Sequence, residues 1–301
     1  MRSRLLTFTA TGAAVTALSL AGGSAASAAP GRAAAHARAA AHAPPSVSAG
    51  SVMGASGGSY SGAAGNAWHH DRTCTPQATL WGWVPGQVFP YLVDNDQFAG
   101  ASGRSCIQTT DGHNFRVLNN TAPWRGVVTR FPQIRVGPFD RSRDPGSGFP
   151  YEVKALPNLI VHADVNGAGV PGAWLGEVHM WFYNSAAVRG PGTVELVLIM
   201  QHHDWVPYYS RCLRVSQLRV CGNDHKAGPT GHRWPLIVLR LVYPRSHLGL
   251  NVRALFYRLR RMRWLGPDRW LGNVEVGVEC ASGCKGFYAS MTVDIRKPRR
   301  R

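Results

Sequence analysis

The sequence contains few acidic residues: 16 of its 301 residues are Asp or Glu, against 33 Lys and Arg, and only five are glutamate. A basic excess of this kind is typical of proteins that bind nucleic acids or other polyanions. However, the chain has no groove-reading or base-stacking motif, and its clearest basic run is the tail 296–301. We therefore expect a solvated basic surface that adheres to acidic cell walls, and no nucleic-acid partner. Binding of polyanions through a helix and this tail is the alternative.

The N-terminal apolar run is too short to span a membrane. Leu5–Leu20 is diluted by Thr and Gly, follows Arg2 and Arg4, and precedes the small residues of 26–28. That order is typical of a cleaved secretory signal, whereas a membrane anchor needs about 20 predominantly apolar residues. We predict a signal peptide at 1–28 and a secreted, extracellular protein without a membrane partner.

The next segment, 29–67, consists almost entirely of Ala, Gly, Ser, Pro and His. A chain of this composition cannot bury enough apolar surface to offset the entropy of ordering it. We predict a disordered linker there, one folded domain at 68–297 and a basic tail at 298–301. Two tandem domains are the alternative, and the absence of a second linker argues against them.

Short runs of alternating polarity, separated by turn signals such as Pro191-Gly192, recur through the predicted domain. Leu175–Tyr183 is one example. This pattern predicts an antiparallel β-sandwich or barrel. One segment, about 250–264, instead spaces its apolar residues three or four apart, which predicts a single helix packed on the sheet with its arginines facing away.

Six cysteines in an exported chain predict disulfides. Proximity in the sequence suggests Cys212–Cys221 and Cys280–Cys284, which leaves Cys74 and Cys106 to tie down the first strands. A metal site is the alternative, but the paired CxxC spacing of zinc modules is missing. His202 and His203 do not favour a metal either, because adjacent strand residues point to opposite faces; we expect a solvated loop there. No metal is predicted.

Glu195 is a charged residue inside the otherwise apolar run Thr193–Met200, which reads as a strand. Side chains of a strand alternate, so Glu195 shares a face with Val197 and Ile199. An ionised carboxylate is rarely left in such surroundings unless it is paired or used. The protein is therefore predicted to be built around a sheet face that carries carboxylates.

Two other runs carry glutamates in the same alternation. Glu275 and Glu279 share one face of their strand, and Glu177 shares a face with His179 and Trp181. A cleft for sugar hydrolysis combines aromatic rings, which stack on the apolar faces of pyranose rings, with carboxyls. Glycoside hydrolysis uses two carboxyl groups. The alternation alone leaves a second interpretation open, in which the glutamates are salt-bridged on a solvated face.

The order of motifs from Tyr91 to Ile295, about two thirds of the chain, resembles glycoside hydrolase family 12, the secreted endoglucanases with a β-jelly-roll fold. Val194–Ile199 is similar to the family's Glu-Ile-Met-Ile-Trp, and Gly277-Val278-Glu279 to its Gly-Phe-Glu. Glu177–Phe182 lies where the family has Tyr-Asp-Ile-Trp, and Val93–Phe98 where it has Asn-Asn-x-Trp-Gly.

The resemblance implies an all-β jelly-roll sandwich of two antiparallel sheets with one packed helix at about 250–264. It implies a retaining endo-β-1,4-glucanase that acts on a β-glucan or xyloglucan without a cofactor, and we expect a monomer. Glu195 would be the nucleophile and Glu279 the acid/base, with their carboxyls about 5 to 5.5 Å apart. The predicted substrate-binding residues are Asn95, Phe98, His179 and Trp181.

Several positions depart from the family's pattern. Phe98 stands in place of a Trp, and Val197 and Ile199 in place of Met and Trp, which removes aromatic surface. His179 replaces an Asp that hydrogen-bonds the nucleophile; a neutral His still donates one hydrogen bond, and a charged one favours the ionised form of Glu195. We predict a changed substrate or low activity on plain cellulose. The alternative is a carbohydrate- or cell-wall-binding sandwich that has lost turnover.

Overall fold

A computed structural model describes residues 72–76, 78–82, 90–97, 103–121, 128, 130–138, 147–188, 193–204, 211–225 and 235–296. These residues belong to one compact unit of the chain. The predicted signal peptide, linker and C-terminal tail lie outside them, as does Phe98. No helix within the described ranges combines the length and apolar character that crossing a membrane would take.

The smaller of two sheets has six strands in the spatial order β1-β4-β5-β16-β8-β14. They are Arg72–Thr73 (β1), Ser105–Gln108 (β4), Asn114–Asn120 (β5), Tyr288–Arg296 (β16), Asn158–Asn166 (β8) and His247–Asn251 (β14). Burial alternates along β8, where every second residue from Leu159 to Val165 is buried. One face of this strand therefore packs in the core while the other meets solvent.

The larger sheet has the order β11-β12-β13-β10-β9-β15-β6-β3-β2, with β7 paired to β15. Its strands are Arg211–Val215 (β11), Leu218–His225 (β12), Leu236–Leu241 (β13), Val194–His203 (β10), Trp174–Tyr183 (β9), Trp270–Cys280 (β15), Arg130–Val136 (β6), Tyr91–Gln97 (β3), Ala78–Gly82 (β2) and Tyr151–Glu152 (β7). A short 3₁₀ helix, Val153–Ala155, follows β7. Among the described pairs, only β10 and β13 run parallel.

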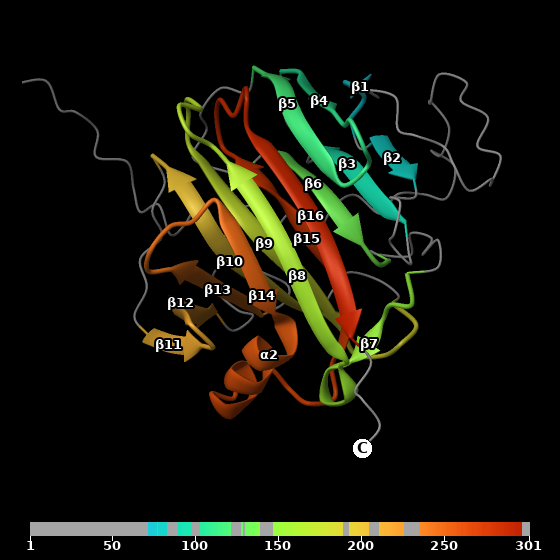
Figure 1. Ribbon diagram of the computed structural model, residues 1–301, viewed down its shortest axis with the longest axis vertical. Helices are drawn as coiled ribbons and strands as arrows, with labels where there is room; N and C mark the ends of the chain where they lie inside the picture. The colour runs from blue at the N-terminus through green and yellow to red at the C-terminus, as the bar shows by residue number, and fades with distance from the viewer. Residues whose placement is uncertain are drawn as a thin grey trace, which may run out of the picture. The chain divides into compact units, whose positions relative to one another are not determined.

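The two sheets lie face to face, with β8, β14 and β16 in front of β9, β10 and β15 in Figure 1. Alternate residues of the larger sheet fill the space between them, for example Val178, Met180 and Phe182 of β9. All ten residues of β9 are buried, so its other face is covered as well. The predicted all-β sandwich with one packed helix is confirmed.

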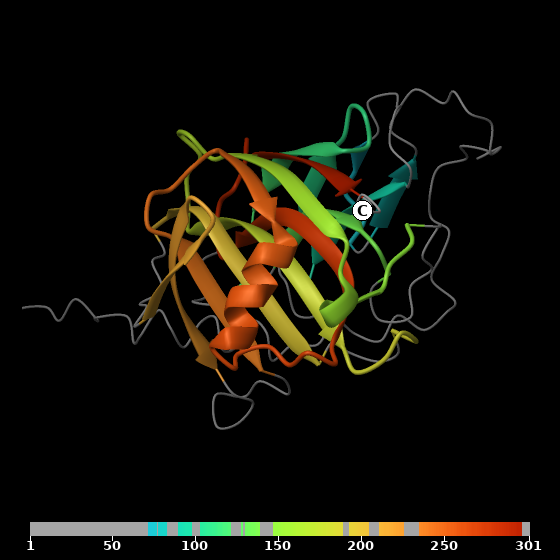
Figure 2. The ribbon, with the colours of Figure 1, turned by 60° about the horizontal axis from the view of Figure 1, so that its bottom comes forward.

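The helix α2, Val252–Arg261, follows β14 directly and lies near β8, β11 and β14 (Figure 2). Asn251 caps it by accepting a hydrogen bond from the Ala254 backbone N–H at 2.9 Å. Phe256 packs edge-on against Phe182 of β9, with ring centroids 5.0 Å apart. The buried stripe consists of Val252, Leu255, Phe256 and Leu259.

This helix is shorter than the predicted 250–264 at both ends. Leu250 and Asn251 complete β14 by pairing with β8, so the helix cannot begin before residue 252. After the last helical turn, Arg263 adopts a left-handed conformation with φ of 60°, which breaks the helical path.

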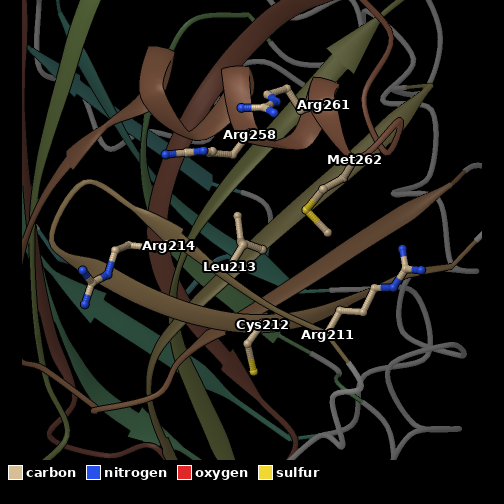
Figure 3. Close-up of a pocket in the computed structure, with 7 residues that line it drawn as sticks. All are labelled: Arg211, Cys212, Leu213, Arg214, Arg258, Arg261 and Met262. Carbon is tan, nitrogen blue, oxygen red and sulfur yellow. The ribbon is translucent and has the colours of Figure 1, made fainter. Parts of the chain in front are cut away.

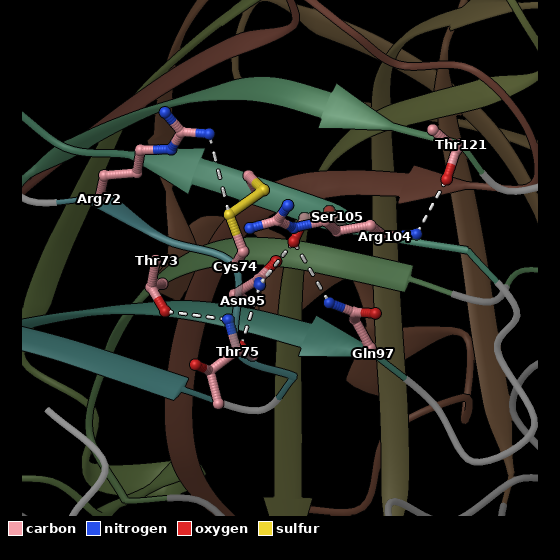
Figure 4. Close-up of a disulfide and its surroundings, with 10 residues drawn as sticks. Arg72, Thr73, Cys74, Thr75, Asn95, Gln97, Arg104, Ser105 and Thr121 are labelled. Atoms are coloured by element: carbon pink, nitrogen blue, oxygen red, sulfur yellow. Dashed lines mark hydrogen bonds between the residues drawn. A yellow bond between two sulfur atoms is a disulfide. The ribbon is translucent and has the colours of Figure 1, made fainter.

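The six cysteines form the three predicted disulfides, Cys74–Cys106, Cys212–Cys221 and Cys280–Cys284. The first joins the segment after β1 to β4 (Figure 4). The second joins directly opposite residues of β11 and β12, and the third closes the connection between β15 and β16. Disulfides of this kind stabilise a fold mainly by restricting the unfolded chain.

His202 and His203 were expected in a solvated loop, and that expectation is wrong. Both belong to the end of β10. The His203 Nδ1 lies 2.6 Å from the Gly172 carbonyl oxygen, and the His203 ring stacks on Trp174 at 6.0 Å. In the part of the chain that the structure describes, no group of three or more His, Cys, Asp or Glu could hold a metal ion.

Candidate active site

The candidate active site lies on the face of the larger sheet that points away from the smaller sheet, and β9 is its centre. The register places Glu195 of β10 opposite Trp181, and Glu275 of β15 opposite His179. Glu177 lies opposite Gly277. Since side chains alternate along a strand, these residues share one face, while the intervening apolar residues pack in the core. The alternation predicted from the sequence is therefore present.

His179 lies between two carboxylates from the strands on either side of it. Its Nε2 is 2.9 Å from Glu195 Oε1, and its Nδ1 is 3.4 Å from Glu275 Oε2. Both contacts are ion pairs by distance rather than aligned hydrogen bonds. The Phe131 ring meets the imidazole at 5.2 Å and the Trp181 ring at 5.3 Å, so aromatic groups fix its position.

The carboxylates favour the charged form of His179 despite its burial. Burial by itself lowers the pKa of an imidazole, but the contact with Glu195 and the charges of Glu195, Glu275 and Glu279 outweigh it, so the pKa of His179 is raised. The imidazole therefore lies between two carboxyl groups that both favour its protonation. This arrangement suits a carboxylate that must stay ionised to act as a nucleophile.

Glu279 is suited to hold a proton at neutral pH. Burial raises its pKa to about 8, with a contribution from the charge of Glu195 and an opposing one from His179. The contribution from Glu195 means that the two carboxyls interact electrostatically although they come from distant parts of the chain. A nearby cation favours the ionised form of a carboxyl, whereas burial favours the neutral form. Two carboxyls in these two environments can serve as nucleophile and as acid.

Glu177 is a third carboxyl between the two predicted catalytic residues. It is fully buried, and within the described residues neither of its oxygens has a hydrogen-bond partner. Burial, followed by the charges of Glu279, Glu195 and Glu275, raises its pKa well above the ordinary value. Burial and the neighbouring carboxylates therefore favour the protonated form of Glu177.

A second cation, Arg135 of β6, balances part of the negative charge. Its Nε donates to Asp94 Oδ2 at 3.0 Å, and its Cα lies opposite Glu275. Burial raises the pKa of Glu275 to about 7, opposed by His179 and Arg135. Asp96 of β3 lies on the same face, and burial together with the charge of Asp94 raises its pKa to about 7.

Four of the six predicted site residues meet on this face: Glu195, Glu279, His179 and Trp181. Asn95, predicted to bind substrate, is not on this face, because its side chain points between the two sheets. Its Nδ2 donates to the backbone carbonyls of Thr75 at 3.0 Å and Ser105 at 3.2 Å (Figure 4). Phe98 lies outside the described residues.

Three site residues were not predicted: Glu177, Glu275 and Asp96. The period-two alternation had already placed Glu177 beside His179 and Glu275 beside Glu279, and that signal was sufficient to include them. Asp96 follows from the alternation of β3, in which Asp94 and Asp96 face the carboxylates. None of the three could be assigned a contact without the register of β3, β6, β9 and β15.

The predicted catalytic side chains are largely enclosed, with Glu195 4 % exposed and Glu279 7 % exposed. Beyond Glu195, the same face becomes apolar. There Val197 and Ile199 of β10 belong to a separate buried cluster with Leu236 and Val238 of β13. The positions that lack the family's Met and Trp are thus filled by packed aliphatic side chains.

No protein-family model and no curated protein matches the sequence. Solved structures do match the fold. A metagenome-derived glycoside hydrolase family 12 endoglucanase aligns with a TM-score of 0.67 at 20% identity, over 77% of this chain and 100% of that chain. The endoglucanase cel12A from Rhodothermus marinus aligns with a TM-score of 0.66 at 20% identity, over 76% and 100% of the two chains.

A native family 12 xyloglucanase from Bacillus licheniformis aligns with a TM-score of 0.61 at 18% identity, over 75% of this chain and 100% of that chain. Each of these solved proteins is thus matched over its whole length. The part of this chain that aligns accordingly has the β-jelly-roll fold of the family 12 glycoside hydrolases.

Proposed function

We propose that the protein is a retaining endo-β-1,4-glucanase-like hydrolase of β-glucan or xyloglucan, with Glu195 as nucleophile and Glu279 as acid/base. The observation that carries the proposal is the contrast between the two carboxyls: Glu195 Oε1 lies 2.9 Å from Nε2 of His179, whose pKa is raised, and burial raises the pKa of Glu279 to about 8. Retaining hydrolysis requires one ionised and one protonated carboxyl. The fold shared with endoglucanases and a xyloglucanase supports the substrate class.

In the first step, a Glu195 oxygen bonds to the anomeric carbon while the glycosidic C–O bond breaks, and Glu279 gives its proton to the departing oxygen. In the second step, Glu279 takes a proton from water, the hydroxide attacks the anomeric carbon, and the ester bond to Glu195 breaks. His179 favours the ionised form of Glu195 before attack and again as it leaves. Trp181 lies opposite Glu195 in the register and is buried.

The register offers a second candidate for the acid. The β9 residue opposite Glu195 is two residues from the one opposite Glu275, and six residues from the one opposite Glu279. A retaining pair needs carboxyls about 5 to 5.5 Å apart, and the charge of Glu195 contributes to the raised pKa of Glu279. We assign the acid to Glu279 because Glu275 already contacts His179.

The test compares initial rates of reducing-sugar release from mixed-linkage β-glucan and from xyloglucan. Glu195→Gln and Glu279→Gln are expected to lower kcat by at least about a hundredfold, the scale of general acid catalysis. Glu275→Gln is expected to lower it by less than about tenfold. Glu152→Gln is the control, because this carboxyl is partly exposed on β7 and pairs with Lys154 at 2.7 Å. A loss in Glu275→Gln equal to that in Glu279→Gln would reassign the acid.

A second function, carbohydrate binding without turnover, is favoured by one observation: the face beyond Glu195 is packed with aliphatic residues. In that case the wild type and Glu195→Gln would bind xyloglucan with equal affinity and would both fail to hydrolyse it. Measuring binding isotherms beside the rates separates the two functions. Activity that depends on Glu195 excludes the second.

We also propose that the protein is exported and acts as a monomer. Its three disulfides support export, because such bonds form and persist in oxidising compartments. Mass spectrometry of the protein from culture medium is expected to show all six cysteines oxidised and the first 28 residues removed. Light scattering is expected to give the mass of one chain. A reduced, cell-retained protein would contradict export.

A further inference from the structure

A pocket of about 630 Å³ lies between the edge strand β11 and the end of α2. In Figure 3 the side chains of Leu213 and Met262 point into the space between strand and helix. The spatial order β11-β12-β13-β10 separates this pocket from the strand that carries Glu195. The lining residues are Arg211, Cys212, Leu213 and Arg214 of β11, and Arg258, Arg261 and Met262 at the end of α2.

Among the described residues that line the pocket, four are arginines and none is acidic. All four side chains belong to exposed residues. Within the described residues, none of the four makes an ion pair. Four like charges around one concavity repel each other, whereas an ordinary surface intersperses charges of both signs. An anion bound among the four arginines would relieve this repulsion.

Stabilisation of α2 accounts for only part of this arrangement. Cations in the last helical turn interact favourably with the helix dipole, which explains Arg258 and Arg261. Arg261 also lies over the ring of Tyr257 at 6.0 Å. Neither reason applies to Arg211 and Arg214, which come from a strand on the opposite side of the pocket.

The lining combines two kinds of chemistry. Guanidinium groups bind carboxylate and phosphate groups through paired N–H donors. Leu213 and Met262 add an apolar surface between them, suited to the non-polar face of a sugar ring (Figure 3). The volume falls in the range of pockets that hold small molecules, roughly 300–1,000 Å³. None of the described lining residues is aromatic, so these residues offer no stacking platform of the kind found in single-stranded nucleic-acid sites.

We propose that this pocket binds a short segment of an anionic polysaccharide. Carboxylate or phosphate groups on the chain contact Arg211, Arg214, Arg258 and Arg261, and an intervening sugar ring lies against Leu213 and Met262. The site is separate from the carboxylate face, and the inference stands whether or not the protein hydrolyses glucan. Part of the basic excess of the sequence is then located around this pocket.

The test measures binding to the full exported chain by calorimetry at about 50 mM salt, where surface charges are weakly screened. The probes are a trimer of galacturonic acid, a phosphodiester-linked glycerol oligomer, neutral cellotriose and a short single-stranded DNA. The two anionic saccharide-type probes distinguish a carboxylate source from a phosphate source. One of the two anionic saccharide-type probes is expected to bind most tightly. Cellotriose is expected to bind at least about tenfold more weakly than that probe.

The variant Arg211→Gln/Arg258→Gln removes one charge from each side of the pocket. Arg253→Gln/Arg260→Gln is the matched control, since these exposed arginines of α2 carry the same charge and do not line the pocket. The pocket variant is expected to weaken binding at least about tenfold and the control less than about twofold. Met262→Ser is expected to weaken binding of the galacturonic acid trimer and to leave binding of inorganic tripolyphosphate unchanged.

Three outcomes would overturn the proposal. Equal weakening in the pocket and control variants would mean that net charge alone attracts the ligand. Equal affinity for cellotriose would mean that the arginines take no part. DNA binding as tight as that of the anionic saccharides, with the same loss in the pocket variant, would make the site a general polyanion site.

Discussion

Glu195 Oε1 lies 2.9 Å from His179 Nε2, on neighbouring strands of the larger sheet, and both residues are buried. The other imidazole nitrogen faces Glu275 at 3.4 Å. The carboxylates raise the pKa of His179, and the charge of His179 in turn opposes the rise that burial causes in the pKa of Glu275. In the proposed mechanism this contact takes the place of the Asp that the family-12 pattern has at the same position.

Replacing His179 is expected to impair Glu195. In His179→Gln the carboxylates of Glu195 and Glu275 lose the cation between them, so we expect kcat on mixed-linkage β-glucan to fall by at least about tenfold. The deficit should be largest near pH 5 to 6 and should shrink as the pH rises through the raised pKa of His179. Values of kcat measured from pH 4 to 9 on the folded variant and on the wild type test this prediction. A deficit in kcat that does not change with pH contradicts it.

Activity is expected to fall in alkaline solution because the acid must carry a proton. With the pKa of Glu279 raised to about 8, kcat/KM should be maintained to near pH 8 and then decline about tenfold per pH unit. Loss of activity already near pH 5, where an ordinary glutamate ionises, would show that the acid is not buried in this way.

Stability is expected to decrease from acid to mildly alkaline pH. A carboxyl with a raised pKa binds its proton more tightly in the folded chain, so its contribution is complete below the unfolded value of about 4.3. The contribution is lost as the pH rises through the folded pKa, about 7 for Glu275 and about 8 for Glu279. Thermal unfolding followed by circular dichroism should therefore give a higher Tm at pH 5 than at pH 8. The reverse order would contradict the burial of these groups.

Glu177→Gln should remove part of that pH dependence, because glutamine is neutral at every pH. Because the pKa of Glu177 is raised in the folded chain, the variant is expected to lose less unfolding free energy than the wild type between pH 5 and pH 8. Denaturant unfolding at the two pH values measures the difference. Glu152→Gln, at a partly exposed ion pair, serves as control and should show no comparable change.

The disulfide Cys74–Cys106 closes a loop of 32 residues in sequence separation. Its removal by Cys74→Ser/Cys106→Ser is expected to lower the unfolding free energy by roughly 3 to 4 kcal/mol, the loop-closure value for this length. Denaturant unfolding of the variant beside the wild type measures the loss. An unchanged midpoint would mean that the first strands add nothing to the cooperative unit.

The sequence determines faces more reliably than contacts. Alternation alone placed Glu195 and Glu279 on the strand faces that point away from the core. The same rule applied to β3 places the Asn95 side chain on the core face. Tyr91 and Val93 are buried in the core, and a residue two further along shares their face. The prediction of Asn95 as a substrate-binding residue rested on the family motif and not on the local alternation of β3.

The contacts of His179 could not be predicted, because they depend on which residues of β10 and β15 lie opposite β9. Register is set by turns and by packing across three strands that are distant in the sequence. The predicted helix was too long for a similar reason: pairing of Leu250 and Asn251 with β8 overrides their helical spacing. The local spacing of apolar residues predicts the helix, and the pairing of β14 with β8 determines where it begins.

The most direct test of the account is proton NMR of xyloglucan or mixed-linkage β-glucan during hydrolysis by the wild type and by Glu195→Gln. The account predicts that the first product formed by the wild type has the β configuration at its new reducing end, and that Glu195→Gln forms none. A first product in the α configuration, or hydrolysis by Glu195→Gln at the rate of the wild type, would contradict the assignment of Glu195 as the nucleophile.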